Sequence, residues 1–391
     1  MPSLWIVLVV LVLAIVAYVV AIRRSLTLAG GDSRRLHSRT TYYGWNAAIM
    51  TAVPALLLLA ILREPSLIRT IAVLALALVG MALAIAMTSP SFRARNRVES
   101  YVKALLIVCS LTAILTTVGI VLSLVFETGS FFKQYSWTDF FFSTTWSPRF
   151  GGGSQLGILP LIWGTLYISI IALAVAVPIG LFAAIYMSEY ASSRVRTLVK
   201  PMIEVLAGIP TIVYGLFALV TVGPMLRDYF AQPLGLGQSG ASVMNAGLVM
   251  GIMLIPFVSS LSDDIINAVP QSLRDGALGL GSTQSETVKK VVLPAALPGI
   301  VGAILLAASR AIGETMIVVL GAGAAAKMDM NPFEAMTTIT VKIVSQLTGD
   351  TDFRAPETLV AFALGLTLFV LTLGLNIIAL YVVRKYREQY E

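Results

Sequence analysis

The chain has 391 residues, of which 57% are hydrophobic and only 12% are charged, and its formal net charge is +7. Soluble domains carry about 25% charged residues, so this composition excludes an ordinary soluble protein and indicates a membrane protein. With one histidine, His37, and one cysteine, Cys109, the chain also lacks the cluster of ligands that a structural zinc site needs.

The first predicted span covers residues 4–22, an uninterrupted apolar run. A cleaved signal peptide is the alternative for such a run. However, the usual basic region in front of it is missing, and signal peptides have apolar regions of only about 7–15 residues. Basic residues follow the run instead, beginning with Arg23 and Arg24. This order predicts that the following loop stays inside and that the N-terminus lies outside.

Further apolar runs follow, so we expect an all-α, polytopic membrane protein with about nine transmembrane helices. The later runs are residues 45–62, 67–88, 104–126, 158–188, 201–226, 243–262, 297–323 and 358–383. A basic stretch at 89–103 separates the third run from the fourth. We therefore expect an N-terminal extension of about three helices, residues 1–103, before a six-helix core, residues 104–391.

Lysine and arginine are distributed unevenly between the loops of this nine-span arrangement. The inside segments hold 18 of the 27, the outside segments hold 8, and Arg310 lies within a span. Cytoplasmic loops carry such an excess, which explains the net charge without nucleic acid as a partner. The sequence thus predicts a multi-pass membrane protein with the N-terminus outside and the C-terminus in the cytoplasm.

A long polar segment, residues 263–298, lies on the predicted inside. Ser272 and Asp275 have the spacing of a capping box, which predicts a short helix there. Two glycines then allow a turn, and Ser282 or Thr283 could cap a second helix. Such a helix–turn–helix could dock a partner protein, or it could be a solvated amphipathic loop, and the residues alone leave both interpretations open.

The spacing within this segment resembles the EAA loop of binding-protein-dependent ABC importer permeases. The family pattern is E-A-A, three residues, G, nine residues, I, one residue, L-P, and this chain has D-G-A and V in place of E-A-A and I. The resemblance implies that the loop seats in a cleft of a separate ATPase subunit and transmits its closure to the spans. The coupling-loop residues that it indicates are Asp275, Gly276, Ala277, Leu280, Gly281, Leu293 and Pro294.

Three other strings, residues 157–169, 204–215 and 299–316, are similar to those of permeases that import inorganic phosphate. The similarity covers about residues 104–391 and implies a MetI-like type I importer core, located in a bacterial plasma (inner) membrane. It also implies the permease subunit of an ATP-driven phosphate importer that works by alternating access. The alternatives are a permease for another oxyanion, such as molybdate or sulfate, an ion-coupled secondary transporter, and a membrane receptor that reports phosphate.

The chain contains no P-loop of the type G-x-x-x-x-G-K-[ST], so we expect a transporter subunit without an ATPase site of its own. No cofactor is expected in this chain, because ATP and Mg would be bound by the partner ATPase. The resemblance implies a second homologous permease, two copies of the ATPase subunit and an extracytoplasmic phosphate-binding protein as partners. Membrane lipid would surround the spans, and no nucleic acid is expected.

Arg310 and Glu314 lie within the predicted span 297–323, although a charge at the bilayer centre costs about 2.5–3.5 kcal/mol on insertion scales. Being four residues apart, they would share a helix face and could pair. One hypothesis is a structural ion pair that holds this helix to a neighbour. The other is that Arg310 attracts phosphate through its guanidinium fork while Glu314 weakens the grip. The resemblance favours the second and assigns Arg310, Glu314 and Thr315 to the substrate pathway.

Overall fold

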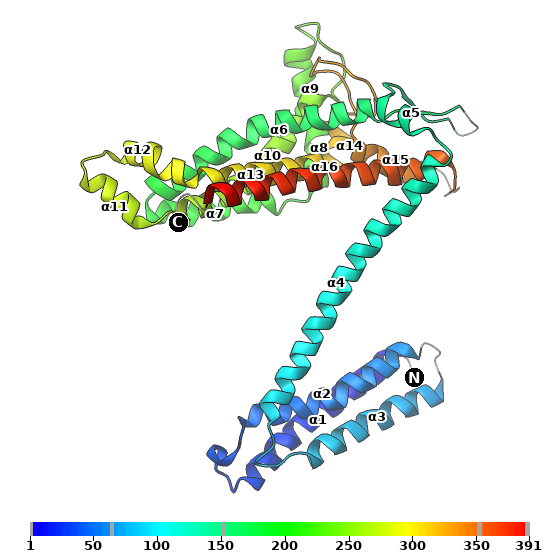
Figure 1. The fold of residues 1–391 in the computed structure, drawn as a ribbon, viewed down its shortest axis with the longest axis vertical. Helices are drawn as coiled ribbons and strands as arrows, with labels where there is room; N and C mark the ends of the chain where they lie inside the picture. The colour runs from blue at the N-terminus through cyan, green and yellow to red at the C-terminus, as the bar shows by residue number, and fades with distance from the viewer. Residues whose placement is uncertain (1–2, 63–65, 150–152, 350–353, 388–391) are drawn as a thin grey trace. The chain divides into compact units, whose positions relative to one another are not determined.

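The computed structural model describes residues 3–62, 66–149, 153–349 and 354–387, and its regular structure is almost entirely helical (Figure 1). Within these residues, nine helices are long and apolar enough to cross a membrane. The expectation of an all-α protein with about nine spans is therefore confirmed. The chain divides into two units, Met1–Val118 and Gly119–Glu391.

The first unit is built from three packed helices and the first part of a fourth. Its elements are α1 (Ser3–Leu28), the 3-10 turn η1 (Ser33–Arg35), α2 (Thr40–Ile61), α3 (Leu67–Ala86) and the beginning of α4 (Ala94–Phe132). Small residues allow these helices to pack closely, as is common in membranes. A Cβ atom on Gly80 would lie 2.2 Å from the carbonyl oxygen of Met50, so the α2–α3 contact requires glycine there.

The second unit contains the remaining elements. In chain order they are α5 (Trp137–Phe142), β1 (Trp146–Ser147), β2 (Gln155–Leu156), α6 (Leu159–Ile185), η2 (Tyr186–Tyr190), α7 (Ser193–Ala207), α8 (Thr211–Phe217), η3 (Ala218–Val222), α9 (Gly223–Leu226), η4 (Arg227–Ala231), α10 (Val243–Ala268), α11 (Gln271–Gly279), α12 (Gln284–Thr287), η5 (Val288–Val292), α13 (Leu293–Ile312), α14 (Met316–Gly321), α15 (Ile339–Gly349) and α16 (Pro356–Arg387). The segments η2 to η5 are π-helical.

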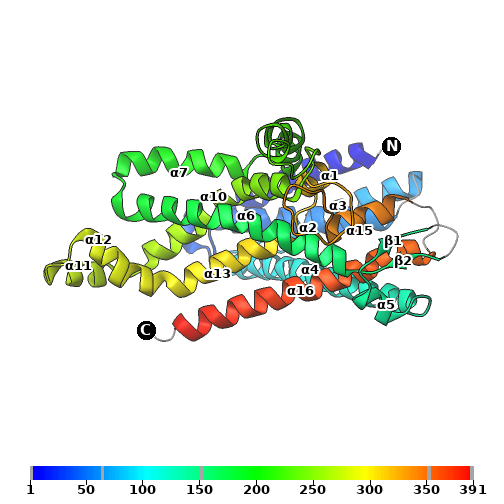
Figure 2. The same ribbon diagram turned by 90° about the horizontal axis from the view of Figure 1, so that it is seen from above.

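Helix α10 forms the centre of the second unit, with 67% of its most apolar window buried. It packs along α6, as Figures 1 and 2 both show. Two glycines on α10 permit this approach: a Cβ on Gly247 would lie 2.6 Å from Ile171 and one on Gly251 would lie 2.8 Å from Val175. Close backbone approach at small residues is the usual way in which membrane helices associate.

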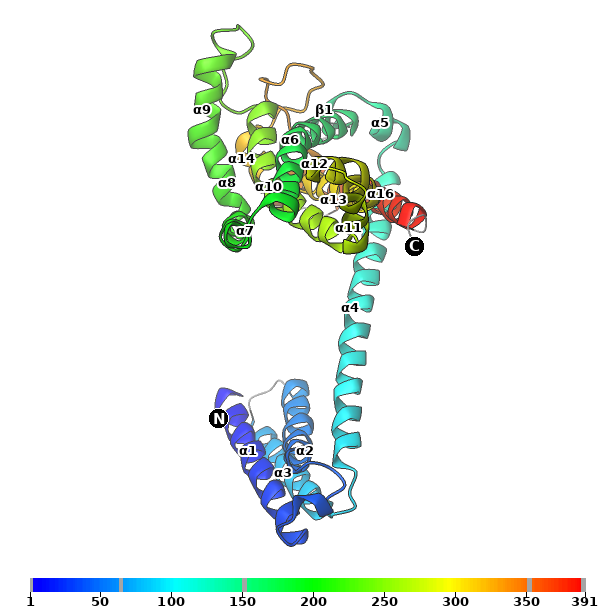
Figure 3. The same cartoon turned by 90° about the vertical axis from the view of Figure 1, so that its left-hand side faces the viewer.

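The two ends of the second unit have different structures. In Figures 1 and 2, α11, α12 and the C-terminal end of α16 lie at one end, and α5 with the β1–β2 hairpin lies at the other. The hairpin pairs Trp146 with Leu156, and both side chains join a buried cluster with Phe131 and Phe140. Seen from the α11–α12 end, α8 and α9 form one rod at the edge of this unit, beside α10 and α14 (Figure 3).

The prediction of a span at residues 201–226 is wrong in its limits. The structure has a separate helix α7, Ser193–Ala207, and a span that runs from Thr211 to Ala231. Helix α7 carries several charges and contains no buried residue, so it lies at the surface of this unit, in contact with α10. The chain leaves the helix at Gly208 because Pro210 cannot continue it. The expected domain boundary at residue 103 lies within α4 and stays a prediction.

Candidate functional site

The predicted span 297–323 is broken at its charged positions. Helix α13 ends at Ile312, residues 313–315 are not helical, and α14 begins at Met316. The hydroxyl of Thr340, from α15, donates a hydrogen bond of 2.9 Å to the backbone carbonyl of Glu314. This bond satisfies a carbonyl that a continuous helix would have used itself. The prediction of one continuous helix face is therefore wrong, because a residue from a later element supports the break.

Arg310 and Glu314 form no ion pair in the described part of the chain, and each has another contact. Arg310 is exposed in the last turn of α13, where the helix dipole favours a cation, and its guanidinium lies 5.9 Å from the ring centre of Phe257. A carboxylate oxygen of Glu314 accepts a hydrogen bond of 3.1 Å from the backbone N–H of Met316. The two residues therefore do not pair as they could on one helix face, and no carboxylate of the described residues binds the guanidinium of Arg310.

Thr315, the third predicted pathway residue, lies at the same break. Its side chain is partly buried, and its hydroxyl donates a weak hydrogen bond of 3.4 Å to the carbonyl of Gly313. The break thus brings a guanidinium, a carboxylate and a hydroxyl together within six residues. Arg310 lies in the candidate span Gln284–Ile312 and the other two groups directly follow its end. A charged residue within a span is a functional-site hypothesis by default.

The predicted helix–turn–helix is present, formed by α11 and α12. Gly281, in the turn, has a φ of +88°, which favours glycine over other residues. Thr283 caps α12 in a capping box with Glu286. The sequence signal for the turn and the second helix is therefore confirmed.

The start of α11 differs from the expected capping box. Its N-cap residue is Pro270, and no side chain caps the helix there. The carboxylate of Asp275 instead accepts a hydrogen bond of 3.1 Å from the amide of Gln271. The helix predicted from the spacing of Ser272 and Asp275 is present, but these residues do not form a capping box. The fixed φ of Pro270 instead defines where α11 begins.

The predicted coupling residues divide into an exposed tip and a base. Asp275, Gly276 and Gly281 are exposed, Ala277 is half-buried, and Leu280 is 91% exposed. Leu293 and Pro294 begin α13 beyond the turn, so they lie at the base. An exposed leucine at the end of a polar loop is a surface that a partner protein could cover.

A buried carboxylate next to this loop was not expected from the sequence. The polar segment is predicted to begin at Asp263, but α10 continues to Ala268 and the residue is 0% exposed. Arg196 donates to both of its oxygens at 3.1 Å, and Lys200 donates at 2.9 Å. The hydrogen bond to Asp263 raises the pKa of Lys200. A buried charge needs a partner, and the two residues that pair with Asp263 lie 63 and 67 residues earlier in the chain. No local sequence pattern therefore predicts that this carboxylate is buried.

A second ion pair, between Glu189 and Arg274, lies under α11 beside a polar cavity of about 440 Å³.

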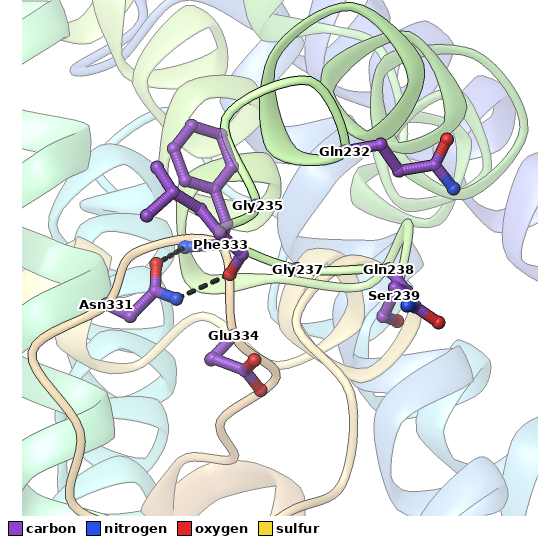
Figure 4. Close-up of a pocket in the computed structure, with 9 residues that line it drawn as sticks. Gln232, Gly235, Gly237, Gln238, Ser239, Asn331, Phe333 and Glu334 are labelled. Atoms are coloured by element: carbon purple, nitrogen blue, oxygen red, sulfur yellow. Dashed lines mark hydrogen bonds between the residues drawn. The ribbon is translucent and has the colours of Figure 1, made fainter.

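A larger cavity of about 660 Å³ lies between the loop after η4 and the loop that precedes α15 (Figure 4). There the side-chain N–H of Asn331 donates to the carbonyl of Leu236, and this bond joins the two loops. The side-chain oxygen of Asn331 accepts a hydrogen bond from the N–H of Phe333 within its own loop. No predicted site residue lines this larger cavity. Among the described residues, no group of three or more His, Cys, Asp or Glu could hold a metal ion.

Two family models match the chain. Residues 176–388 match the family described as "Binding-protein-dependent transport system inner membrane component". Residues 7–77 match a second family, described as "Phosphate ATP-binding cassette transporter". The first match contains both the helix break and the α11–α12 loop, and the second lies within the first unit.

Several curated relatives are similar over most of their own length. The "Phosphate transport system permease protein PstC 1" of Mycobacterium tuberculosis is 37% identical over an alignment of 278 residues, and the match covers 63% of this chain and 81% of the relative. The "Phosphate transport system permease protein PstC" of Haemophilus influenzae is 30% identical over 74% of this chain and 95% of the relative. A "Probable ABC transporter permease protein YqgH" of Bacillus subtilis is 31% identical over 60% of this chain and 74% of its own.

Among solved structures, a chain of a bacterial ABC transporter for the import of the acidic polysaccharide alginate superposes with a TM-score of 0.51. It is 17% identical, and the alignment covers 74% of this chain and 99% of that one. At this identity the similarity concerns the fold alone. The expected permease fold is confirmed, with its helices in the arrangement of an ABC importer.

Proposed function

Because this chain belongs to the family of binding-protein-dependent transport system inner membrane components, we propose that it is the membrane-spanning permease subunit of an ATP-driven importer of inorganic phosphate. The observation that carries the proposal is the helix break at residues 313–315, at the end of the candidate span Gln284–Ile312, beside an Arg310 guanidinium that has no carboxylate partner among the described residues. The PstC names of relatives that are 37% and 30% identical support phosphate as the substrate.

The chemistry of the break suits a weakly held oxyanion. Arg310 is permanently charged and offers several donors in one plane, which matches the oxygens of phosphate. Glu314 carries a negative charge four residues away, which opposes a permanent grip on the anion. Thr315 adds a hydroxyl that can donate to the same oxyanion. We assign these three residues to the substrate pathway.

The remaining assignments concern partners. The exposed α11–α12 tip would seat in a PstB-type ATPase subunit, present in two copies that bind ATP and Mg, and this chain would need no cofactor of its own. A second, PstA-type permease would cover the other side of the pathway, and a PstS-type phosphate-binding protein would deliver the ion from outside. One related structure is that of a bacterial alginate ABC transporter in complex with a periplasmic protein that binds an alginate pentasaccharide, and it supports such an arrangement.

Uptake of labelled phosphate by proteoliposomes that contain the whole complex tests the function. We expect uptake that requires ATP and the binding protein, and that a tenfold excess of sulfate or molybdate does not reduce. Strong competition by either anion would favour the permease of another oxyanion. Uptake driven by an ion gradient in the absence of ATP would favour a secondary transporter.

The orientation of the chain gives a separate prediction. We propose that the N-terminus lies outside and the C-terminus in the cytoplasm, with residues 1–103 as an extension of the 104–391 core. In a variant without the exposed Cys109, Lys289→Cys should resist an impermeant thiol reagent in sealed right-side-out vesicles, whereas Leu234→Cys should react. Both positions are exposed, so accessibility depends on the side of the membrane. The reverse labelling pattern would refute the orientation.

A further inference from the structure

We propose that the Glu189–Arg274 ion pair is the positioning contact through which movement of the α11–α12 tip reaches α6 and α10. The inference rests on the proposed function, since it assigns a role within the same transport cycle. It concerns two residues outside the predicted coupling set, on elements that are far apart in the sequence.

The ion pair is almost fully shielded from solvent, although α11 itself is exposed. The side chains of Arg274 and Glu189 are only 11% and 10% exposed, whereas α11 contains no buried residue. The Arg274 Nε and Nη2 atoms donate to the same carboxylate oxygen at 3.1 Å and 2.9 Å. Removing one partner of an ion pair that is shielded from water leaves the other charge unpaired, which is costly. This contact therefore holds α11 in one position.

The same guanidinium also joins α11 to the end of α10. Its Nη1 atom donates to the carbonyl of Val269 at 2.5 Å, and its Nη2 atom donates to the carbonyl of Ile266 at 2.7 Å. The last carbonyls of a helix have no partner within the helix and attract cations. The side chain of Arg274 therefore bonds α11 both to η2 and to the end of α10.

Glu189 holds the other side of the loop as well. It lies in η2, the π-helical segment that continues α6, and its backbone carbonyl accepts a hydrogen bond from the amide of Gln284, the first residue of α12. The segment η5 after α12 is also π-helical. Such segments often occur at functional sites. The end of α6 is thus bonded to both helices of the loop.

Helix α11, unlike α12 and η5, contains no buried residue of its own. Helix α11 has nine residues, which is too short to be stable in water by itself, and it contains Gly276 as a weak helix former. Glu286 of α12 and Lys290 of η5 form an exposed pair at 3.7 Å, within the continuous helical run that leads into α13. Movement of α11 would therefore reach α6 and α10 through Arg274 rather than through these exposed charges.

The test measures ATP hydrolysis and phosphate uptake separately in the whole complex. For Glu189→Gln and Arg274→Lys we expect ATP hydrolysis within twofold of wild type but uptake at least tenfold lower. Lysine keeps the charge, but its single nitrogen atom cannot reproduce contacts that the guanidinium spreads over Nε, Nη1 and Nη2, so Arg274→Lys removes the fork without removing the charge. The matched control is Lys290→Met, which removes the exposed pair of the same loop and should leave both rates unchanged.

A second readout follows the position of α11 independently of the substrate. Spin labels at Ser272→Cys on α11 and Phe182→Cys on α6, in a chain without Cys109, should give a narrow distance distribution that broadens in Glu189→Gln. A wild-type complex that hydrolyses ATP but takes up no phosphate would refute the proposed substrate and leave this measurement valid.

Two results would overturn the inference. One is unchanged uptake with an unchanged distance distribution in both variants. The other is an equal loss of hydrolysis and uptake, or a failure of the ATPase to co-purify, in Arg274→Lys as well as in Glu189→Gln. The pair would then serve assembly rather than the transmission of movement.

Discussion

Replacement of Arg310 by glutamine is expected to reduce phosphate uptake by about a hundredfold or more, in a complex that still assembles. Hydrogen bonds to charged groups contribute about 1.5–3 kcal/mol each. Loss of two such bonds from a guanidinium fork amounts to about 3 kcal/mol, and each 1.4 kcal/mol corresponds to a factor of ten. The side chain is exposed in the last turn of α13 and pairs with no carboxylate in the part of the chain that the structure describes, so its removal leaves no buried charge behind there. Folding should therefore be preserved.

The measurement is uptake in proteoliposomes, with assembly followed by co-purification of the ATPase. Arg227→Gln is a matched control, because it removes an arginine whose exposed ion pair with Asp228 contributes little. Its uptake should stay within twofold of wild type. Arg310→Lys should restore only a small part of the activity, since a point charge cannot replace the fork. Near-normal uptake by a properly assembled Arg310→Gln complex would exclude a direct role in conducting the ion.

An exchange of the two charges separates the pathway hypothesis from a structural pair. Arg310→Glu combined with Glu314→Arg would keep the activity if the residues were an interchangeable ion pair. The structure has no such pair, and Glu314 instead binds the N–H of Met316. An arginine at position 314 could not accept that hydrogen bond. We expect the double variant to be inactive, and substantial uptake by it would restore the structural explanation.

The sequence predicted the fold where the signals are local. Apolar runs predict spans because lipid requires helices, and nine candidates are found in the described residues. The α11–α12 turn could also be predicted, because Gly281 and Thr283 determine it within a few residues. The apolar residues at the end of α7 run directly into those of the next helix, so the prediction joins the two from residue 201. The charged residues of α7, namely Arg194, Arg196, Lys200 and Glu204, and the proline at position 210 mark it as a separate helix.

The features that the sequence did not reveal depend on distant partners. The break at residue 313 depends on a bond from Thr340, and Asp263 is buried because Arg196 and Lys200 come from another helix. The contact between Glu189 and Arg274 spans 85 residues of sequence. A single sequence contains no pairing information at such separations, so local patterns assign these charges to interfaces or loops.

Gly281→Asp is expected to lower phosphate uptake by at least tenfold while the permease still inserts. Gly281 has a φ of +88°, and non-glycine residues in left-handed conformations cost about 1–2 kcal/mol. Aspartate tolerates this region better than most residues, but it also places a negative charge just beyond the C-terminus of α11, where the helix dipole disfavours anions. Both effects act on the exposed tip that we assign to the ATPase contact.

The matched control for this variant is Gly279→Ala, two residues earlier at the end of α11. Position 279 has no positive φ, and a Cβ there would meet no atom within 4 Å, so alanine should leave uptake within twofold of wild type. A Cβ on Gly281 would also meet open space, which excludes a steric clash as the cause of its defect. The measurements are uptake, ATP hydrolysis and co-purification of the ATPase. If Gly281→Asp retains normal co-purification and normal uptake, the tip of this loop is not the ATPase contact.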